Sequence, residues 1–165
     1  MLHFNFLIKN KFSDFSYDLF RILADNMSKI APTGNTLENN YKIWFEAIEN
    51  GLKKDQRKII LIYFHNELIG FFQYYTNNDL FMMEEIQIKP QYQGKENIFR
   101  ELYGYVISNL SNQICLVEAY SNTKNRKSQA ILRKMGLSII GKNKNGDSYH
   151  FRGDYQSLLK WYNHA

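Results

Sequence analysis

The sequence has a single cysteine and two prolines among its 165 residues. The low cysteine count excludes more kinds of site than the low proline count does. One cysteine cannot close an intramolecular disulfide or supply a cysteine-rich zinc site. The run Ile114-Cys115-Leu116-Val117 is typical of a buried strand, so we expect Cys115 to be structural rather than a nucleophile. No two of the four histidines have metal-ligand spacing on one helix, and we therefore predict no bound metal.

Long apolar runs are also missing. No stretch approaches the roughly 20 apolar residues that a membrane-spanning helix needs. The N-terminal sequence MLHFNFLIKNK has no basic leader ahead of an apolar segment, so we expect a cytoplasmic protein without a secretory signal or a membrane partner. Apolar residues make up 44% of the chain, which indicates a folded protein, and its length predicts one domain over residues 1–165.

Excess charge of either sign is small. There are 21 Lys and Arg against 16 Asp and Glu, a net charge of +5 that suits an anionic ligand. A nucleic-acid-binding module usually concentrates its basic residues in a stripe. We therefore rank nucleic-acid binding last among the three functions considered below, and expect no nucleic-acid partner. One local basic cluster is present, formed by Lys124, Arg126, Lys127, Arg133 and Lys134.

Hydrophobic spacing predicts an alternation of strands and helices. A helical crossover should make the strand at 114–120 parallel to the one before it. We predict an α/β fold of three layers, with a mixed, mostly antiparallel sheet that contains a central parallel strand pair. In order, the elements are strand 2–8, a helix capped by Ser13 or Asp14, a helix capped by Thr36, strands 58–64, 68–76 and 80–89, a helix from Ile98, strand 114–120, a short helix ended by Gly136, strands 137–142 and 147–152, and a helix over 154–164.

The chain is organised around the segment from Glu84 to Leu110. A strand ends at Pro90, which has no N–H to give. A basic turn with Gly94 follows, and apolar residues then recur at helical spacing from Ile98. A turn leading into a helix N-terminus presents free N–H groups and the positive end of the helix dipole, so it can bind a phosphate. Taken alone, the segment is equally compatible with a turn that binds nothing.

Three motifs follow one another at characteristic spacing. The hairpin Ile60–Phe71 has an apolar strand, a polar turn and then the pattern apolar-x-Gly-apolar. The segment Glu85–Lys95 has a strand followed by the spacing Gln-x-x-Gly-x, here Gln91-Tyr92-Gln93-Gly94-Lys95. The helix Asn125–Leu137 begins with Asn-x-x-Ser and ends with Lys-Met-Gly-Leu. Together they resemble the motifs of the GNAT superfamily of N-acetyltransferases, over residues 58–152.

The resemblance implies a GNAT-like fold with acetyl-CoA as co-substrate. In the family the pantetheine arm lies beside the strand that precedes the turn. Carried over, the backbones of Ile86, Gln87 and Ile88 would bond the pantetheine amides and the thioester carbonyl. Asn125 and Ser128 would contact the arm from the other wall. The pyrophosphate would be held by the N–H groups of Gln93, Gly94, Lys95, Glu96, Asn97 and Ile98.

Two positions depart from the family pattern. Glu96 and Asn97 stand where a small residue or a second glycine is usual, and a glutamate beside pyrophosphate is unfavourable unless it turns outward. Leu132 stands where many members have a tyrosine that protonates the leaving thiolate, although a thiolate can leave without that help. These departures keep open the alternative of a catalytically weak acyl-CoA-binding or sensor protein.

Acyl transfer to an amine needs a neutral amine held against a polarised thioester. A carboxylate near the acyl group can take the proton. Glu84 and Glu85 are adjacent on the strand and point to opposite faces, so one of them should face the acceptor. Glu118 is a third candidate base and Tyr120 a candidate acid. Each is also explained as a paired carboxylate or a packing aromatic.

The sequence thus predicts an acyltransferase of the GNAT type. It would transfer acetyl from acetyl-CoA to a primary amine of a small molecule or peptide, by direct transfer in a ternary complex. The first two helices, their loop and the three-stranded meander are expected to build the acceptor pocket, although core packing also explains most of their aromatics. The amine partner stays open, as does the choice between a monomer and a homodimer. The aromatics in question are Tyr41, Trp44, Phe45, Tyr74 and Tyr75.

Overall fold

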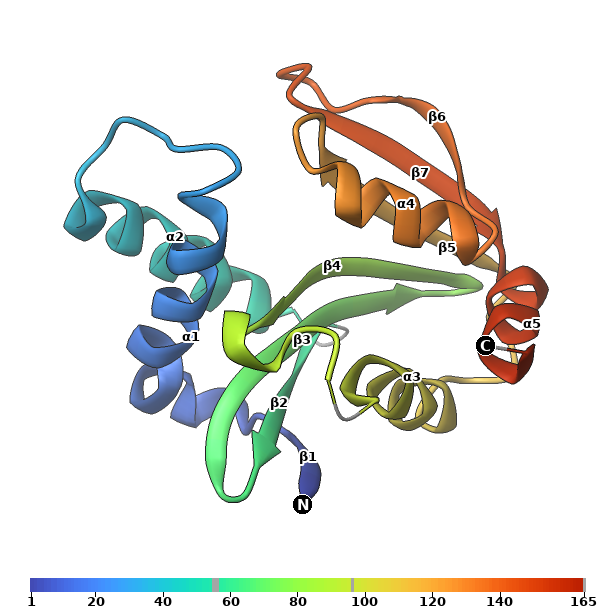
Figure 1. Cartoon of the computed structure of the whole chain (residues 1–165), viewed down its shortest axis with the longest axis horizontal. Helices are drawn as coiled ribbons and strands as arrows, with labels where there is room; N and C mark the ends of the chain where they lie inside the picture. Colours follow the sequence, from blue (N-terminus) through green and yellow to red (C-terminus); the bar gives the residue numbers. More distant parts are fainter. Residues whose placement is uncertain (55–56, 96, 165) are drawn as a thin grey trace. The chain divides into compact units, whose positions relative to one another are not determined.

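The computed structural model describes residues 1–54, 57–95 and 97–164, and its helices and strands follow the predicted order (Figure 1). None of the helices in these ranges has the length and apolar composition of a membrane span. Two short 3₁₀ turns, η1 (Lys9–Lys11) and η2 (Pro90–Tyr92), are additional. The strands are β1 (Leu2–Phe6), β2 (Arg57–Phe64), β3 (Glu67–Asn77), β4 (Leu80–Ile88), β5 (Leu116–Asn122), β6 (Ser138–Lys142) and β7 (Ser148–Asp154). The helices are α1 (Phe12–Met27), α2 (Leu37–Leu52), α3 (Ile98–Ser108), α4 (Arg126–Lys134) and α5 (Tyr155–His164).

The strands form one sheet of seven, in the order β1-β2-β3-β4-β5-β7-β6. β4 and β5 are parallel, with a register that runs from Leu80 opposite Leu116 to Met83 opposite Ala119, and both strands continue beyond it. β1 pairs antiparallel with β2, and β7 pairs antiparallel with both β5 and β6. The predicted α/β fold, with a mixed sheet around a parallel pair, is therefore confirmed.

The chain divides into two compact units, and the division runs through β3 and β4. Unit 1 comprises Met1–Gln73 and Glu85–Glu96, and unit 2 comprises Tyr74–Glu84 and Asn97–Ala165. Each unit has its own core, and each is described below by itself.

In unit 1, α2 begins where the sequence predicts. The N–H of Asn39 donates to Oγ1 of Thr36 at 3.1 Å, which is the capping bond of a helix N-terminus. α2 packs on α1 through aromatic rings: the ring of Phe12 lies 5.3 Å from that of Phe45 and 5.7 Å from that of Trp44. The buried core comprises Leu7, Phe12, Leu19, Ile48, Leu52, Ile59, Leu61 and Phe71.

The prediction that Ser13 or Asp14 caps the first helix is wrong. α1 begins at Phe12, and its N-cap residue Lys11 makes no side-chain capping bond. The reason is that η1 leads directly into α1, so the backbone is already helical when it reaches Ser13. β1 also ends at Phe6, earlier than the predicted strand.

The core of unit 2 lies between its helices and its share of the sheet. Tyr103 of α3 is buried, and its hydroxyl donates to Sδ of Met83 at 3.2 Å. Its ring lies 5.4 Å from that of Trp161, where α5 packs beside α3 (Figure 1). Val117 of β5 and Phe151 of β7 are fully buried in the same unit. Apolar burial thus holds the C-terminal helices to these strands.

Gly136 ends α4, as predicted. Its φ is +94°, a left-handed conformation that glycine adopts without strain. A Cβ at this position would stand only 2.5 Å from Cβ of Ser157 on α5. The position therefore requires glycine for two independent reasons.

The expected burial of Cys115 is wrong. Its side chain is exposed, whereas Ile114 before it is 5% exposed. Neighbouring residues of an extended chain point to opposite sides, so an inward Ile114 turns Cys115 outward. β5 itself begins only at Leu116.

Candidate active site

The backbone of Ile88, at the end of β4, points away from β3. The N–H of Lys89 donates to the carbonyl of Ile69 on β3 at 2.8 Å. The carbonyl of Gln87 lies against Gly70 of β3, where an added Cβ would be 2.4 Å from it. A trans peptide holds its N–H and C=O on opposite sides, so both the N–H and the C=O of Ile88 turn away from β3. Ile88 thus has backbone groups that an extended ligand could pair with.

Amide side chains cover the carbonyl of Ile88. It accepts hydrogen bonds from Nδ2 of Asn26 on α1 at 3.0 Å and from Nε2 of Gln93 at 2.8 Å. Nδ2 of Asn26 also donates to Oε1 of Gln87 at 2.9 Å, and Nε2 of Gln87 donates to Oε2 of Glu85 at 2.8 Å. Glu85 is therefore a paired carboxylate in a polar network of unit 1.

The turn after β4 is partly engaged in its own hydrogen bonds. The N–H of Gln93 and that of Lys95 donate to carbonyls of η2, at 3.3 Å and 3.4 Å. Gly94 has φ +73°, and a side chain there would meet nothing within 4 Å. Glu96, which the sequence analysis places in the pyrophosphate site, lies outside the described residues.

In unit 2, α3 begins at Ile98, as predicted. Asn97 before it is left-handed, with φ 52°, and its side chain makes no capping bond. The first N–H groups of a helix have no partner within the helix. Since Asn97 does not cap them with its side chain, the N-terminus of α3 keeps donors that suit an anion.

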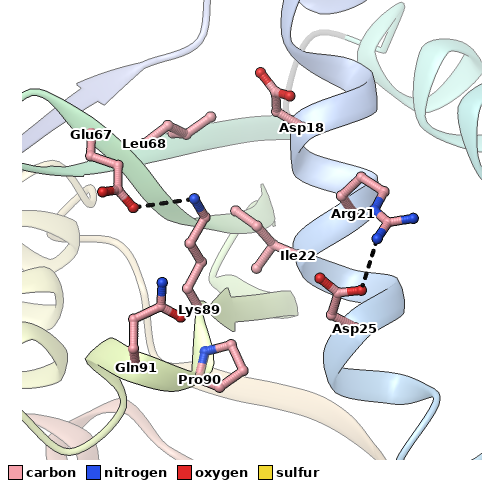
Figure 2. A pocket seen from close by; sticks show the side chains of 9 residues that line it. All are labelled: Asp18, Arg21, Ile22, Asp25, Glu67, Leu68, Lys89, Pro90 and Gln91. Carbon is pink, nitrogen blue, oxygen red and sulfur yellow. Dashed lines mark hydrogen bonds and ion pairs between the residues drawn. The ribbon is translucent and has the colours of Figure 1, made fainter.

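An open polar pocket of about 510 Å³ lies on unit 1, between α1 and the residues that flank β3 and β4 (Figure 2). Nζ of Lys89 is 3.2 Å from Oε2 of Glu67, and Nη2 of Arg21 is 3.4 Å from Oδ1 of Asp25. Figure 2 shows that these two ion pairs stand on opposite walls. Both cations of the lining are already in ion pairs, and Asp18 adds a third carboxylate, so we assign the pocket no ligand.

β5 and β7 of unit 2 bring four side chains together. In the register, Glu118 stands opposite Arg152 and Tyr120 opposite His150. Glu118 is 7% exposed; its Oε1 accepts from Nε2 of His150 at 2.5 Å, and its Oε2 accepts from Nε and Nη2 of Arg152 at 3.2 Å and 3.1 Å. The ring of Tyr120 stacks on that of His150 at 4.4 Å. We call these four residues the β5–β7 cluster.

The cluster changes the reading of two candidate catalytic residues. Both oxygens of Glu118 already accept hydrogen bonds, so the paired-carboxylate alternative describes it better than that of a free base. Tyr120 is 45% exposed and therefore accessible to a ligand. Glu84 and Glu85 are both half-buried on β4, and their catalytic roles stay predictions.

Asn125 caps α4. Its Oδ1 accepts the N–H of Ser128 at 3.1 Å, a bond that fixes the start of the helix. Gln129 is 6% exposed, and its Nε2 donates to the carbonyl of Asn122 and to the next carbonyl, each at 3.1 Å. Leu132 is buried and offers no proton. Contacts of Asn125 and Ser128 with a pantetheine arm remain predictions.

The aromatics expected around an acceptor are largely packed. The hydroxyl of Tyr41 is 2.8 Å from Oγ of Ser16 on α1, and its neighbours on α2 pack as described above. Tyr74 is 2% exposed, with its ring 5.5 Å from that of Phe81. Tyr75 is half-buried. The core alternative therefore accounts for all of them except Tyr75.

Sequence analysis missed four side chains that the structure brings into these sites: Asn26, Gln129, His150 and Arg152. For two of them a signal existed. His150 and Arg152 share one face of the predicted strand 147–152, and Glu118 and Tyr120 share one face of the predicted strand 114–120.

Among residues in the described ranges, no three His, Cys, Asp or Glu side chains gather as metal ligands would.

Comparison with known proteins supports the fold. No family model matches the chain, and no curated protein is detectably similar in sequence. The PaiA N-acetyltransferase of Thermoplasma acidophilum, solved with coenzyme A, is 13% identical with a TM-score of 0.72, and the match covers 94% of this chain and 99% of that one. The chain has the GNAT fold.

Two further GNAT structures are similar. A GNAT family acetyltransferase of Elizabethkingia anophelis with acetyl-CoA bound is 16% identical, with a TM-score of 0.62 over 93% of this chain and 97% of that one. A spermidine N-acetyltransferase chimera from Vibrio cholerae and hSSAT is 14% identical, with a TM-score of 0.60 over 96% of this chain and 98% of that one. At these identities the likeness concerns the GNAT fold alone.

Proposed function

We propose that this chain, acting as one catalytic domain, is an N-acetyltransferase. It transfers acetyl from acetyl-CoA to a primary amine of a small molecule or peptide, directly, within a ternary complex. The observation that carries the proposal is the backbone of Ile88, which turns its N–H and C=O away from β3 directly ahead of a glycine turn and a helix. In a GNAT fold, these are the features that acyl-CoA binding needs.

The acyl-CoA would be held mainly by backbone. The groups of Ile88, with those of Ile86 and Gln87 beside it, would pair with the pantetheine amides. The side-chain amides of Asn26 and Gln93 donate hydrogen bonds to the Ile88 carbonyl. The ligand would therefore either displace one of these side chains or bind beside both. The pyrophosphate would lie at the turn and at the N-terminus of α3, where uncapped N–H groups favour an anion.

The acetyl group is already activated as a thioester. The chain must hold its carbonyl against the amine and accept a proton from the amine. Glu84 and Glu85 are the candidate bases on β4, and the exposed Tyr120 is the candidate acid for the leaving thiolate. Similar structures include a spermidine N-acetyltransferase and a GNAT of nucleotide-linked sugars. Spermidine, a nucleotide-linked amino sugar and a short peptide are therefore the acceptors to test first.

The first experiment is calorimetric titration of Gly94→Trp with acetyl-CoA. Gly94 has φ +73°, with open space around it, and a tryptophan there would fill the turn. Gly146, in the turn between β6 and β7, has φ +75° and equally open space, so Gly146→Trp is a matched control. We expect micromolar binding by wild type and Gly146→Trp, and loss of at least tenfold in Gly94→Trp. Equal binding by both variants would remove the turn from the site.

Release of free thiol from acetyl-CoA across the three acceptors then tests catalysis. The alternative function, an acyl-CoA-binding protein with little catalysis, is favoured by the buried Leu132 at the position of the usual acid. Tight acetyl-CoA binding without thiol release from any acceptor would support that alternative and contradict the enzyme.

A further inference from the structure

The positive charge of the chain is concentrated on α4 and β6 of unit 2. Seven of the 21 Lys and Arg residues lie within residues 119–146, and this range contains no Asp or Glu. In the rest of the chain, 14 Lys and Arg are outnumbered by 16 Asp and Glu, so the net charge of +5 comes entirely from this range. The seven cations are the five of the basic cluster, with Lys142 at the end of β6 and Lys144 in the turn after it. We call these residues, together with β6, the α4–β6 surface.

The seven cations are open to solvent and not neutralised. All seven residues are exposed. Within the described part of the chain, none of them is in an ion pair. The cation of Lys142 lies over the ring of Tyr149 at 5.6 Å, a contact that leaves its charge in place. The acidic residue nearest in sequence on this side, Asp147, accepts a hydrogen bond from Asn143 at 2.6 Å. The surface thus has a charge that an anionic partner could neutralise.

The cations flank β6 at both of its ends. The N–H of Thr123, just ahead of α4, donates to the carbonyl of Asp147 at the β6–β7 turn at 2.9 Å. At the other end of α4, the guanidinium of Arg133 lies 5.9 Å from the ring of Phe151, which stands opposite Ile139 in the register. α4 therefore begins beside the end of β6 and finishes beside its start (Figure 1).

β6 offers an open strand edge between these cations. It is the last strand of the sheet, and among the described residues only β7 pairs with it. The backbone N–H and C=O groups on the outer edge of such a strand can pair with another strand. Every residue of β6 is exposed, including Ile139 at 39% and Ile140 at 49%. A Cβ added at Gly141 would meet nothing within 4 Å, so there is room beside the strand.

Protection of the edge explains only part of this arrangement. The register shifts between Ile139 and Gly141, and bulges and cations both discourage an edge strand from pairing. Two copies of the chain would bring like charges together on pairing, which is unfavourable. Exposed neighbouring isoleucines have the opposite effect, because apolar residues make an edge more adhesive. Cations beside isoleucines would reject a second copy and accept a strand of opposite charge.

We propose that the α4–β6 surface is a docking site for an extended acidic segment of another protein, which adds a strand to β6. Its backbone pairs with the outer edge, its apolar side chains contact Ile139 and Ile140, and its Asp and Glu side chains face the seven cations. A polypeptide fits better than a nucleic acid, because a strand edge pairs with a peptide backbone. The site lies wholly in unit 2, and the inference does not depend on the proposed acetyltransfer.

The test measures fluorescence anisotropy of a labelled acidic peptide, EEVEVEVEVE, with the full chain. The basic peptide KKVKVKVKVK has the same valines and the opposite charge. We expect saturable binding of the acidic peptide that weakens as salt is raised, and no binding of the basic one. Two further acidic peptides carry N-methyl groups on alternate amides, one in each phase. One phase should lose binding by at least about tenfold, because its methyl groups occupy the hydrogen bonds of the added strand.

Charge reversal locates the site on the chain. In the double variant Lys134→Glu with Lys142→Glu, two attractions become repulsions, and the Kd of the acidic peptide should rise by at least about tenfold. The matched control is Lys11→Glu with Lys42→Glu. It has the same net charge, but its two exposed lysines belong to unit 1. It should keep the wild-type Kd to within about twofold.

Three results would overturn the inference. They are absence of acidic-peptide binding by wild type, equal binding of both N-methylated peptides and their parent, and equal weakening in the two double variants. Binding of a 20-nucleotide single-stranded RNA more tightly than the peptide would assign the surface to nucleic acid and overturn it too. The peptide and RNA measurements use wild type alone, so they do not depend on how the variants fold. None of these results bears on the titration with acetyl-CoA, which tests the proposed function separately.

Discussion

At the scale of single residues, Gly136 offers the sharpest test of the fold. Its φ of +94° is strained for any other residue, and a methyl group would collide with Ser157. We expect Gly136→Ala to lower the free energy of unfolding by about 1–3 kcal/mol, measured by urea denaturation. Gly141 on β6 is the control, because a Cβ there meets nothing within 4 Å. Gly141→Ala should change stability by less than about 0.5 kcal/mol, and coincident curves for the two variants would contradict the steric argument.

Residue roles were the least predictable from sequence. Glu118 was a candidate because it lies on the predicted strand 114–120, but its partners His150 and Arg152 are more than thirty positions later on β7. Which residues of two strands face each other depends on the register, and no local pattern encodes it. The same holds for Asn26, whose contact with Ile88 joins a helix to a distant strand.

At the scale of elements, the Thr36 cap carries a measurable share of stability. Its Oγ1 accepts the N–H of Asn39, which would otherwise have no partner in the first turn of α2. We expect Thr36→Ala to lower the free energy of unfolding by about 1 kcal/mol, measured by urea denaturation. Thr36→Ser keeps the hydroxyl and should lose far less. If the serine variant were as unstable as the alanine variant, the hydroxyl would not be the cause.

Elements were predicted well where one signal dominated. Periodic apolar residues gave the central strands and helices, and Thr36, Gly136 and the turn after β4 marked their ends. The failures occurred where two signals competed. Ser13 and Asp14 are good capping residues, but η1 starts the helical path before them. Cys115 stands in an apolar run, but its neighbour Ile114 takes the inward position.

At the scale of the whole molecule, buried tyrosines should set the alkaline limit of stability. Burial, together with the nearby Tyr105, raises the pKa of Tyr74 to about 12. Burial also raises the pKa of Tyr103, Tyr155 and Tyr63. Above a pH of roughly 10 the unfolded chain releases these protons while the folded chain keeps them, so stability falls as pH rises.

The contribution of Tyr74 can be isolated. Below a pH of roughly 10 both states keep the proton, and Tyr74→Phe should have no pH-dependent effect. Between there and a pH of about 12, wild type should lose stability more steeply than Tyr74→Phe, by about 1.4 kcal/mol per pH unit. Urea denaturation at a series of pH values measures the slopes. Tyr17→Phe, at a position 51% exposed, is the control and should keep the wild-type slope.

The global fold followed from the order of elements and from the helical crossover between β4 and β5, which requires a parallel pair. The position of the last hairpin did not follow: β7, not β6, pairs with β5. Chain order alone allows either strand beside β5. That placement is what brings His150 to Glu118, so the fold was predictable further than the site.

The outward position of Cys115 has a practical consequence for quantification. It is the chain's one cysteine, and its thiol is exposed. A reagent that counts the thiol released from CoA will therefore also count one equivalent of protein. The same offset, read before substrate is added, gives the molar concentration of protein in each assay and thereby an internal standard for every turnover number.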